Sequence, residues 1–167
     1  RSSERAIAGR HPWLLASTIQ DMSRTISDGE VVDIVQTDGR WLGRGIYNSA
    51  SRLRVRVYGW DETRQLDNDW FFERLELAID LRKILSNGSP VEAQRIVFSE
   101  ADQLSGLIVD RYAGYLVVQQ TAAAMNRFIE PCVARLVEVY QPRGVLLRVD
   151  RKTAVAEGLE DGQQLLY

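Results

Sequence analysis

The chain has 167 residues, of which 45% are hydrophobic and 26% are charged, and its formal net charge is −2. This length suits one domain or two small ones, and folding should bury about two thirds of the surface that the unfolded chain exposes. No apolar run approaches a membrane span, and the single cysteine, Cys132, and the single histidine, His11, exclude an internal disulfide and a Cys- or His-rich metal site. We therefore expect a cytoplasmic protein without a metal ion.

The two ends of the chain indicate an excised fragment. The chain opens on Arg1 rather than on methionine, and it stops at Tyr167, within a segment that reads as a strand. We therefore expect it to be part of a longer protein.

Basic residues gather in the N-terminal part. Residues 1–60 carry nine Arg against six acids, a balance of +3, whereas residues 61–167 carry 12 basic residues against 17 acids, a balance of −5, and the two sum to −2. The N-terminal part is therefore the better partner for nucleic acid. Only two of the 21 basic residues are lysine, and the planar fork of arginine suits phosphate and guanine edges. A lineage bias toward arginine would give the same composition, and the sequence leaves both explanations open.

The first motif along the chain is Arg10-His11-Pro12-Trp13. His11 is either an RNA contact or an ordinary hydrogen-bonded turn residue. Residues 30–37 are rich in Val and Ile, and Asp38-Gly39 then predicts a hairpin with residues 40–47. Glycines within that second strand indicate a bulge or the close approach of another backbone, so Arg44 between them is expected on an uncrowded surface.

The next strand, residues 52–58, alternates strictly between apolar and basic side chains. Its period of two places Leu53, Val55 and Val57 on the core and three arginines, Arg52, Arg54 and Arg56, on the other face, roughly 7 Å apart. Such a stripe can follow a sugar-phosphate backbone. It can equally be a solvated face that protects an edge strand against aggregation.

A helix is predicted from Trp70 to Leu85, with N-cap candidates at residues 67–69 and a stop at Asn87-Gly88. Its charged residues form one narrow stripe, and apolar residues occupy most of the remaining circumference. We therefore expect this helix to be wedged between two domains, with Arg74 and Arg82 available for interface ion pairs.

The rest of the chain predicts a compact α/β unit with a second main helix. That helix carries Cys132 on its apolar stripe, as a core side chain rather than as a nucleophile. Three carboxylates, Glu100, Asp102 and Asp110, are expected to cap turns, with metal binding or general acid/base chemistry as the alternatives. The predicted elements are a strand at 94–99, a hairpin of 107–109 and 115–119, the helix at 126–140, a strand at 144–149, a link at 151–158 and a strand at 163–167.

Several motifs occur in the order seen in a known family. They are Arg10-His11-Pro12-Trp13, Gly43-Arg44-Gly45-Ile46-Tyr47-Asn48, Ser51 with Arg54-Val55-Arg56, Phe71-Phe72, Glu100-Ala101-Asp102, the run from Gly106 to Tyr112, and Glu157-Gly158. On these residues the chain resembles the N-terminal part of the large-subunit ribosomal RNA cytosine-5 methyltransferases that carry a PUA domain. It departs from the family at residues 103–106, Gln-Leu-Ser-Gly, where Gly-Leu-Pro-Gly is usual.

The resemblance implies an α+β chain made of a PUA-like RNA-binding β-barrel, residues 1–66, followed by a linker helix and a middle α/β domain of strands and two main helices, residues 67–167. It implies that S-adenosylmethionine and the catalytic cysteine belong to a C-terminal Rossmann-like domain that is missing here, so no catalytic, cofactor-binding or metal residue is expected in this part. Ribosomal RNA and the missing domain are the implied partners, and a homodimer stays open. Together with the arginine stripe, these motifs give the expected RNA-binding residues: Arg10, His11, Arg44, Asn48, Ser51, Arg54 and Arg56.

Three functions compete at this point. The first is the targeting and scaffolding part of an RNA methyltransferase, and the second is a free-standing RNA-binding module without catalytic activity. The third, ranked below both, is a metal-dependent nuclease built on the three carboxylates.

Overall fold

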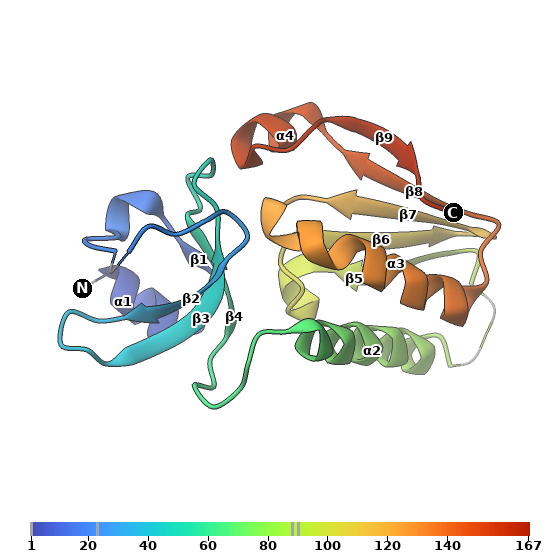
Figure 1. Cartoon of the computed structure of the whole chain (residues 1–167). Coiled ribbons are helices and arrows are strands. Elements are labelled where there is room, and N and C mark those ends of the chain that lie inside the picture. Colours follow the sequence, from blue (N-terminus) through green and yellow to red (C-terminus); the bar gives the residue numbers. More distant parts are fainter. Residues whose placement is uncertain (1, 23, 88, 90) are drawn as a thin grey trace.

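The computed structural model describes all residues except 1, 23, 88 and 90, and it contains two β-sheets joined by one long helix (Figure 1). The main helices are α1 (Ser2–Ala8), α2 (Asn68–Leu85), α3 (Asn126–Tyr140) and α4 (Arg151–Glu157). The strands are β1 (Trp13–Leu14), β2 (Val31–Val35), β3 (Trp41–Tyr47), β4 (Val55–Gly59), β5 (Ala93–Phe98), β6 (Leu107–Tyr112), β7 (Tyr115–Gln120), β8 (Gly144–Val149) and β9 (Gly162–Leu165). The predicted α+β class is therefore confirmed. No helix in the part of the chain that is described is both long and apolar enough to cross a membrane.

The first sheet is antiparallel and has the strand order β1-β4-β3-β2. The predicted hairpin at Asp38-Gly39 joins β2 to β3, and the side chain of Asp38 accepts a hydrogen bond of 3.0 Å from the backbone of Arg40. Within β3, a Cβ atom at Gly45 would lie 2.3 Å from the carbonyl oxygen of Arg56, so only glycine lets β4 pair this closely. The register of the pair shifts beside it, between Arg44 and Gly45, which confirms the predicted bulge.

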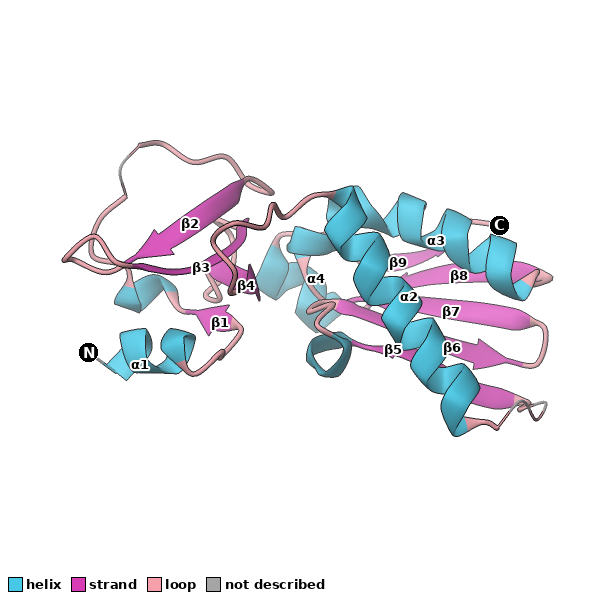
Figure 2. Cartoon of the chain, turned by 90° about the horizontal axis from the view of Figure 1, so that it is seen from below, coloured by secondary structure: helices cyan, strands magenta, loops and turns pink. Residues whose placement is uncertain are grey.

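The second sheet has the order β5-β6-β7-β8-β9, and its one parallel pair, β7 with β8, is connected through α3. Figure 2 shows α2 and α3 side by side over the same face of this sheet. Alternate residues of the strands pack under these helices, among them Val97, Val109, Val118 and Val145, which are all fully buried or nearly so. The sheet is therefore covered by helices on one face.

The wedge expected for α2 is wrong. Only its first turn contacts the first sheet, where the rings of Trp70 and Phe71 lie 5.9 and 5.3 Å from that of Tyr58. The rest of α2 lies on the second sheet beside α3, and its outer side is exposed to solvent. Leu77, Leu81, Ile84 and Leu85 are 53%, 44%, 75% and 71% exposed. The wide apolar band of this helix is thus only half covered by the described residues.

One hydrophobic core runs through both sheets. It includes Ile46 and Tyr58 from the first sheet, and Phe71 of α2 stacks on Phe128 of α3 with ring centroids 3.6 Å apart. Cys132 of α3 is 2% exposed within this core, and burial raises the pKa of its thiol to about 12. The prediction that Cys132 is a core side chain is confirmed, because a thiol with that pKa is not a nucleophile at neutral pH.

Candidate nucleic-acid interface

Arg44 of β3 is buried rather than displayed, so the expectation of an uncrowded surface is wrong. Its guanidinium donates to both carboxylate oxygens of Asp33 on the neighbouring strand, at 2.8 and 3.3 Å, and to the carbonyl oxygen of Arg64 at 2.5 Å. Hydrogen bonding from Arg44 holds the pKa of Asp33 below its usual range. The glycines on either side of Arg44 let β4 approach closely, and the bonds to Asp33 and Arg64 hold the guanidinium against the protein.

Four side chains meet at the junction between the two sheets, and we call them the Glu157 network: Asn48, Ser51, Arg56 and Glu157. The Glu157 carboxylate, at the end of α4, accepts from Ser51 Oγ at 2.7 Å, from Arg56 Nη2 at 3.0 Å and from Asn48 Nδ2 at 3.3 Å. It also accepts from the backbone amide of Ala123 at 3.2 Å. Each of the four residues is at most 7% exposed.

The chain is shaped locally to let these groups meet. Gly158 ends α4 with a φ of 71°, and a Cβ atom there would lie 2.8 Å from that of Ala50. Asn48 also donates to the backbone carbonyl of Glu157 at 2.9 Å, so the end of α4 is held directly against the loop before β4. The expected exposure of Asn48, Ser51 and Arg56 is therefore wrong. An alternating strand pattern fixes which side chains share a face, but it does not say whether water or another part of the protein covers that face.

Further contacts extend this junction toward the second sheet. Arg56 donates to Ser105 Oγ at 3.2 Å and lies 3.7 Å from Glu100, while the Tyr58 hydroxyl donates to the Ser105 carbonyl at 2.6 Å. Burial raises the pKa of Tyr58 above its usual range, so it remains a neutral donor. The Glu157 network and these contacts join the two sheets through buried, mostly charge-assisted hydrogen bonds.

Arg10, His11 and Arg54 are the expected RNA-binding residues that stay accessible. Arg10 and His11 are exposed just after α1, and His11 Nδ1 accepts from the backbone amide of Trp13 at 3.3 Å. Arg54 is half-buried, with its guanidinium 5.8 Å from the Tyr47 ring centroid and bonded to the carbonyl oxygens of Asn48 and Ser49. Of the seven expected RNA-binding residues, these three therefore keep side chains that a ligand can reach.

Trp13 was not singled out as a contact, although it is part of the Arg10-His11-Pro12-Trp13 motif. It is 42% exposed, its ring meets that of His11 edge-on at 5.5 Å, and its indole donates to Glu100 at 3.1 Å. Burial raises the pKa of Glu100, but hydrogen bonds from Ser99, Ser105 and Trp13 outweigh it, so the net direction is downward. The only signal in the sequence was the place of this tryptophan beside Pro12 in that motif.

The other carboxylates are engaged as structural partners. Asp102 accepts from Arg82 at 2.6 and 2.7 Å, and Asp110 accepts from Arg95 at 2.8 and 3.0 Å. Arg82 thus forms the expected ion pair, but within the second sheet unit rather than between domains. No group of three potential metal ligands comes together among the described residues, which removes the basis of the nuclease hypothesis.

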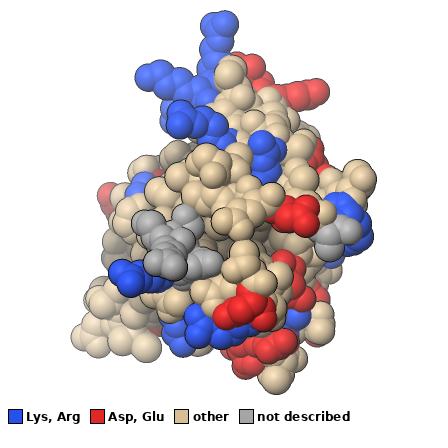
Figure 3. All heavy atoms as spheres, turned by 90° about the vertical axis from the view of Figure 1, so that its left-hand side faces the viewer, with Lys and Arg blue, Asp and Glu red and all other residues tan. Residues whose placement is uncertain are grey.

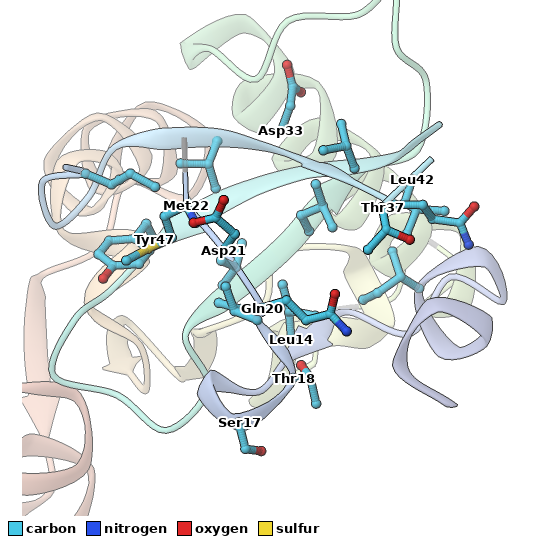
Figure 4. A pocket seen from close by; sticks show the side chains of 18 residues that line it. Leu14, Ser17, Thr18, Gln20, Asp21, Met22, Asp33, Thr37, Leu42 and Tyr47 are labelled. Atoms are coloured by element: carbon cyan, nitrogen blue, oxygen red, sulfur yellow. The ribbon is translucent and has the colours of Figure 1, made fainter. Parts of the chain in front are cut away.

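A cavity of about 600 Å³ lies in the first unit, between β2 and β3 and the segment that contains Gln20 and Met22 (Figure 4). Apolar side chains such as Leu14 and Leu42 line it together with uncharged polar groups and the carboxylate of Asp21, and Figure 4 shows the Asp33 carboxylate pointing away from the centre. No lysine or arginine is among its lining residues. The cavity is therefore poorly suited to a phosphate. Figure 3 instead shows basic side chains gathered at the top of this side of the molecule, the end at which α4 lies in Figure 1.

The comparisons with known proteins agree with this architecture. Residues 1–60 match the model of the PUA-like domain family. The chain is 35% identical over 156 residues to ribosomal RNA large subunit methyltransferase I of Shewanella amazonensis, covering 93% of this chain and 39% of that protein. It is 32% identical over 160 residues to the protein of the same name from Shigella boydii, covering 96% and 40%.

The chain is homologous to these methyltransferases over nearly its whole length. It spans about two fifths of the length of the curated relatives that it matches. A solved structure described as a SAM-dependent methyltransferase from Streptococcus mutans aligns with 99% of the chain at a TM-score of 0.76 and 15% identity, over 41% of that structure's chain. A second, a methyltransferase complexed with SAH, aligns with 99% of the chain and 41% of its own at a TM-score of 0.73 and 17% identity. At these identities the structures show a shared fold.

Proposed function

We propose that the chain is the RNA-binding and scaffolding part of an S-adenosylmethionine-dependent methyltransferase that modifies C5 of a cytosine in large-subunit ribosomal RNA. The observation that carries this proposal is the homology of nearly all of the chain to proteins named ribosomal RNA large subunit methyltransferase I, with a PUA-like match at residues 1–60. The part of those relatives that lies beyond the match would hold the catalytic cysteine and the cofactor. The partner would be ribosomal RNA in the cytoplasm.

The proposed division of labour places an RNA-binding domain in residues 1–66 and a scaffold in residues 67–167. The first sheet is complete at Gly59, and the cap of α2 follows at Asp67, whose side chain accepts from the Trp70 amide at 3.0 Å. Within the first part, Arg10, His11 and Arg54 would contact phosphate or sugar groups. The four buried residues of the expected set would act indirectly, because Arg44 holds β3 and the Glu157 network holds the two sheets at one angle.

The described residues do not fit the cofactor. A nucleotide-like ligand is usually seated by a glycine-rich turn that follows a parallel strand. The parallel strand β8 leads into α4 through Asp150, whose carboxylate accepts from the Thr153 amide at 3.0 Å and so is used to cap the helix. No glycine lies in that turn. We therefore expect the 167-residue chain neither to bind S-adenosylmethionine nor to transfer a methyl group.

Two measurements on the chain test the proposal. Titrating a fragment of large-subunit ribosomal RNA at several salt concentrations should show binding that weakens as salt rises, since phosphate contacts release counterions. Arg10→Ala should lower the affinity and flatten the salt slope, whereas Asp38→Ala in the exposed β2–β3 turn should do neither. Calorimetry with S-adenosylmethionine should give no heat. A chain that does not bind RNA, or one that binds S-adenosylmethionine, would refute the proposed function.

A further inference from the structure

The second sheet has one face that no helix covers among the described residues, and we call it the open face. Both α2 and α3 lie on the opposite side (Figure 2). Strand register identifies the side chains on the open face, because residues paired across strands point the same way. Its rows are Phe98, Ile108, Gln119, Arg148 and Gln163; then Arg95, Asp110, Val117, Leu146 and Leu165; then Ala93, Tyr112, Tyr115 and Gly144.

Three aromatic rings on the open face are half exposed. Phe98, Tyr112 and Tyr115 are 50%, 51% and 52% accessible. The guanidinium of Arg95 lies 4.9 Å from the centre of the Phe98 ring. Two ring atoms of Tyr115 lie 3.4 and 3.5 Å from the position that a Cβ atom would take at Gly144, so this ring leans across β8 and turns surface toward solvent. Aromatic rings presented on an open sheet are the usual means by which proteins stack the bases of single-stranded RNA.

The charge on the open face suits a polyanion. Its one carboxylate, Asp110, is neutralised by two hydrogen bonds from Arg95, whereas Arg148 is exposed and has no ion pair within the described residues. Two more exposed cations, Arg151 and Lys152, follow Arg148 in the chain at the start of α4.

The mixture of residues argues against burial under another protein domain. The row that starts at Phe98 continues through an isoleucine into Gln119 and Arg148. Covering that row with an apolar surface would leave the amide and the unpaired guanidinium without water, which is costly. A nucleic-acid strand offers both groups phosphate and base acceptors, and it needs no continuous apolar contact.

We propose that the open face is a platform for single-stranded RNA, on which Phe98, Tyr112 and Tyr115 stack bases while Arg148 contacts phosphate. This rests on the proposed function and assigns it a second RNA surface, which belongs to the second sheet rather than to the first unit with Arg10. Phe98 pairs with Ile108, and Tyr112 lies four residues further along β6, so the two ends of the platform are about 13 Å apart. A single nucleotide cannot engage both ends, and the ligand is therefore an oligonucleotide.

The test uses the full 167-residue chain and a fluorescein-labelled single-stranded oligouridine, with uridine monophosphate as competitor. Tyr115→Ala should weaken oligouridine binding by about 5- to 100-fold, the range expected when one stacked base loses its ring. Tyr115→Phe keeps the ring and should bind as the wild type does. The matched control is Leu81→Ala, which removes an exposed apolar side chain from α2 and should leave the affinity for oligouridine unchanged. Uridine monophosphate should compete only weakly.

Salt separates stacking from charge on this face. Tyr115→Ala and Phe98→Ala should lower the affinity by the same factor at low and at high salt, since a stacked ring releases no counterions. Arg148→Gln should instead reduce the salt slope. All of these side chains are exposed, so the variants should keep the wild-type circular dichroism spectrum and unfolding midpoint.

Failure of this inference and failure of the proposed function give different results. Ribosomal RNA binding that depends on Arg10 but survives Tyr115→Ala and Phe98→Ala would overturn the platform and leave the proposed function standing. Absence of any RNA binding by the wild type would overturn both. A wild-type chain that self-associates, together with a monomeric Tyr115→Ala variant of equal RNA affinity, would assign the open face to a second copy of the protein and overturn the platform.

Discussion

Replacing Glu157 by alanine should destabilise the chain by about 3–5 kcal/mol, because the change leaves the Arg56 guanidinium buried without its closest carboxylate. The side chains of Arg56 and Glu157 are only 8% and 6% exposed. Glu100 lies 3.7 Å from the other end of the guanidinium and is 35% exposed, so it offsets part of the loss. We therefore expect a value in the lower half of that range. It is still a large share of the roughly 5–15 kcal/mol that stabilises a typical domain.

Urea or guanidinium unfolding, followed by tryptophan fluorescence and by circular dichroism, measures this effect. The matched control is Glu160→Ala, three residues further on, where the side chain is exposed. Replacing both charges, Arg56→Met with Glu157→Leu, should cost less than Glu157→Ala alone, since neither charge is then left unpaired. If Glu157→Ala and Glu160→Ala unfold within about 0.5 kcal/mol of each other, the Glu157 network does not hold the sheets together.

Three further outcomes follow from the same contacts. Leu81→Ala should change the free energy of unfolding by no more than about 0.5 kcal/mol because Leu81 is exposed, whereas Leu75→Ala in the same helix should cost about 2–5 kcal/mol. Similar losses for the two variants in urea unfolding would contradict the packing of α2. The pKa of Glu100 is lower in the folded state, so the stability that this carboxylate contributes is present above about pH 4.3 and is lost as the pH falls through the lowered pKa. Glu100→Gln should therefore make the free energy of unfolding depend less on pH in that acid range, and an unchanged pH dependence would contradict the prediction. Arg54→Ala should weaken ribosomal RNA binding at low salt and lose that effect at high salt, and equal losses at both would indicate a structural role instead.

Most elements of the fold follow from local patterns. The hairpin at Asp38-Gly39, the cap of α2 at Asp67 and the apolar stripe that carries Cys132 were all predictable, because turn chemistry, capping and helical spacing depend on residues close in sequence. The helix α1 and the pairing of the short strand β1 with β4 were not predicted. The two residues of β1 pair with Arg56 and Val55 far along the chain, and such pairing leaves no local pattern.

The expected RNA-binding residues show more clearly what cannot be predicted from the sequence. Arg54 and Arg56 come from the same alternating strand pattern, yet Arg56 is 7% exposed and is held by Glu157, a residue 101 positions away. The period of two places both side chains on one face, and the arginine stripe can then be interpreted as a nucleic-acid contact. What covers that face depends on α4, whose position is set by the second sheet. Buried arginines and exposed arginines therefore look alike in the sequence.

Because Asn48, Ser51 and Arg56 are buried in the Glu157 network, we expect them to affect RNA binding indirectly rather than by the direct contact that the sequence suggested. When a flexible link joins two weak binding surfaces, the effective concentration of the second surface near a bound ligand is limited by the link. A rigid junction that holds both surfaces in the right geometry lets the two affinities combine. Arg10 and His11 lie on the first unit, and the open face with Tyr115 belongs to the second sheet. The hydrogen bonds of Asn48, Ser51 and Arg56 to Glu157 fix the angle between these surfaces. Under the proposed function, the buried polar residues would contribute to RNA affinity by determining where the exposed ones can reach.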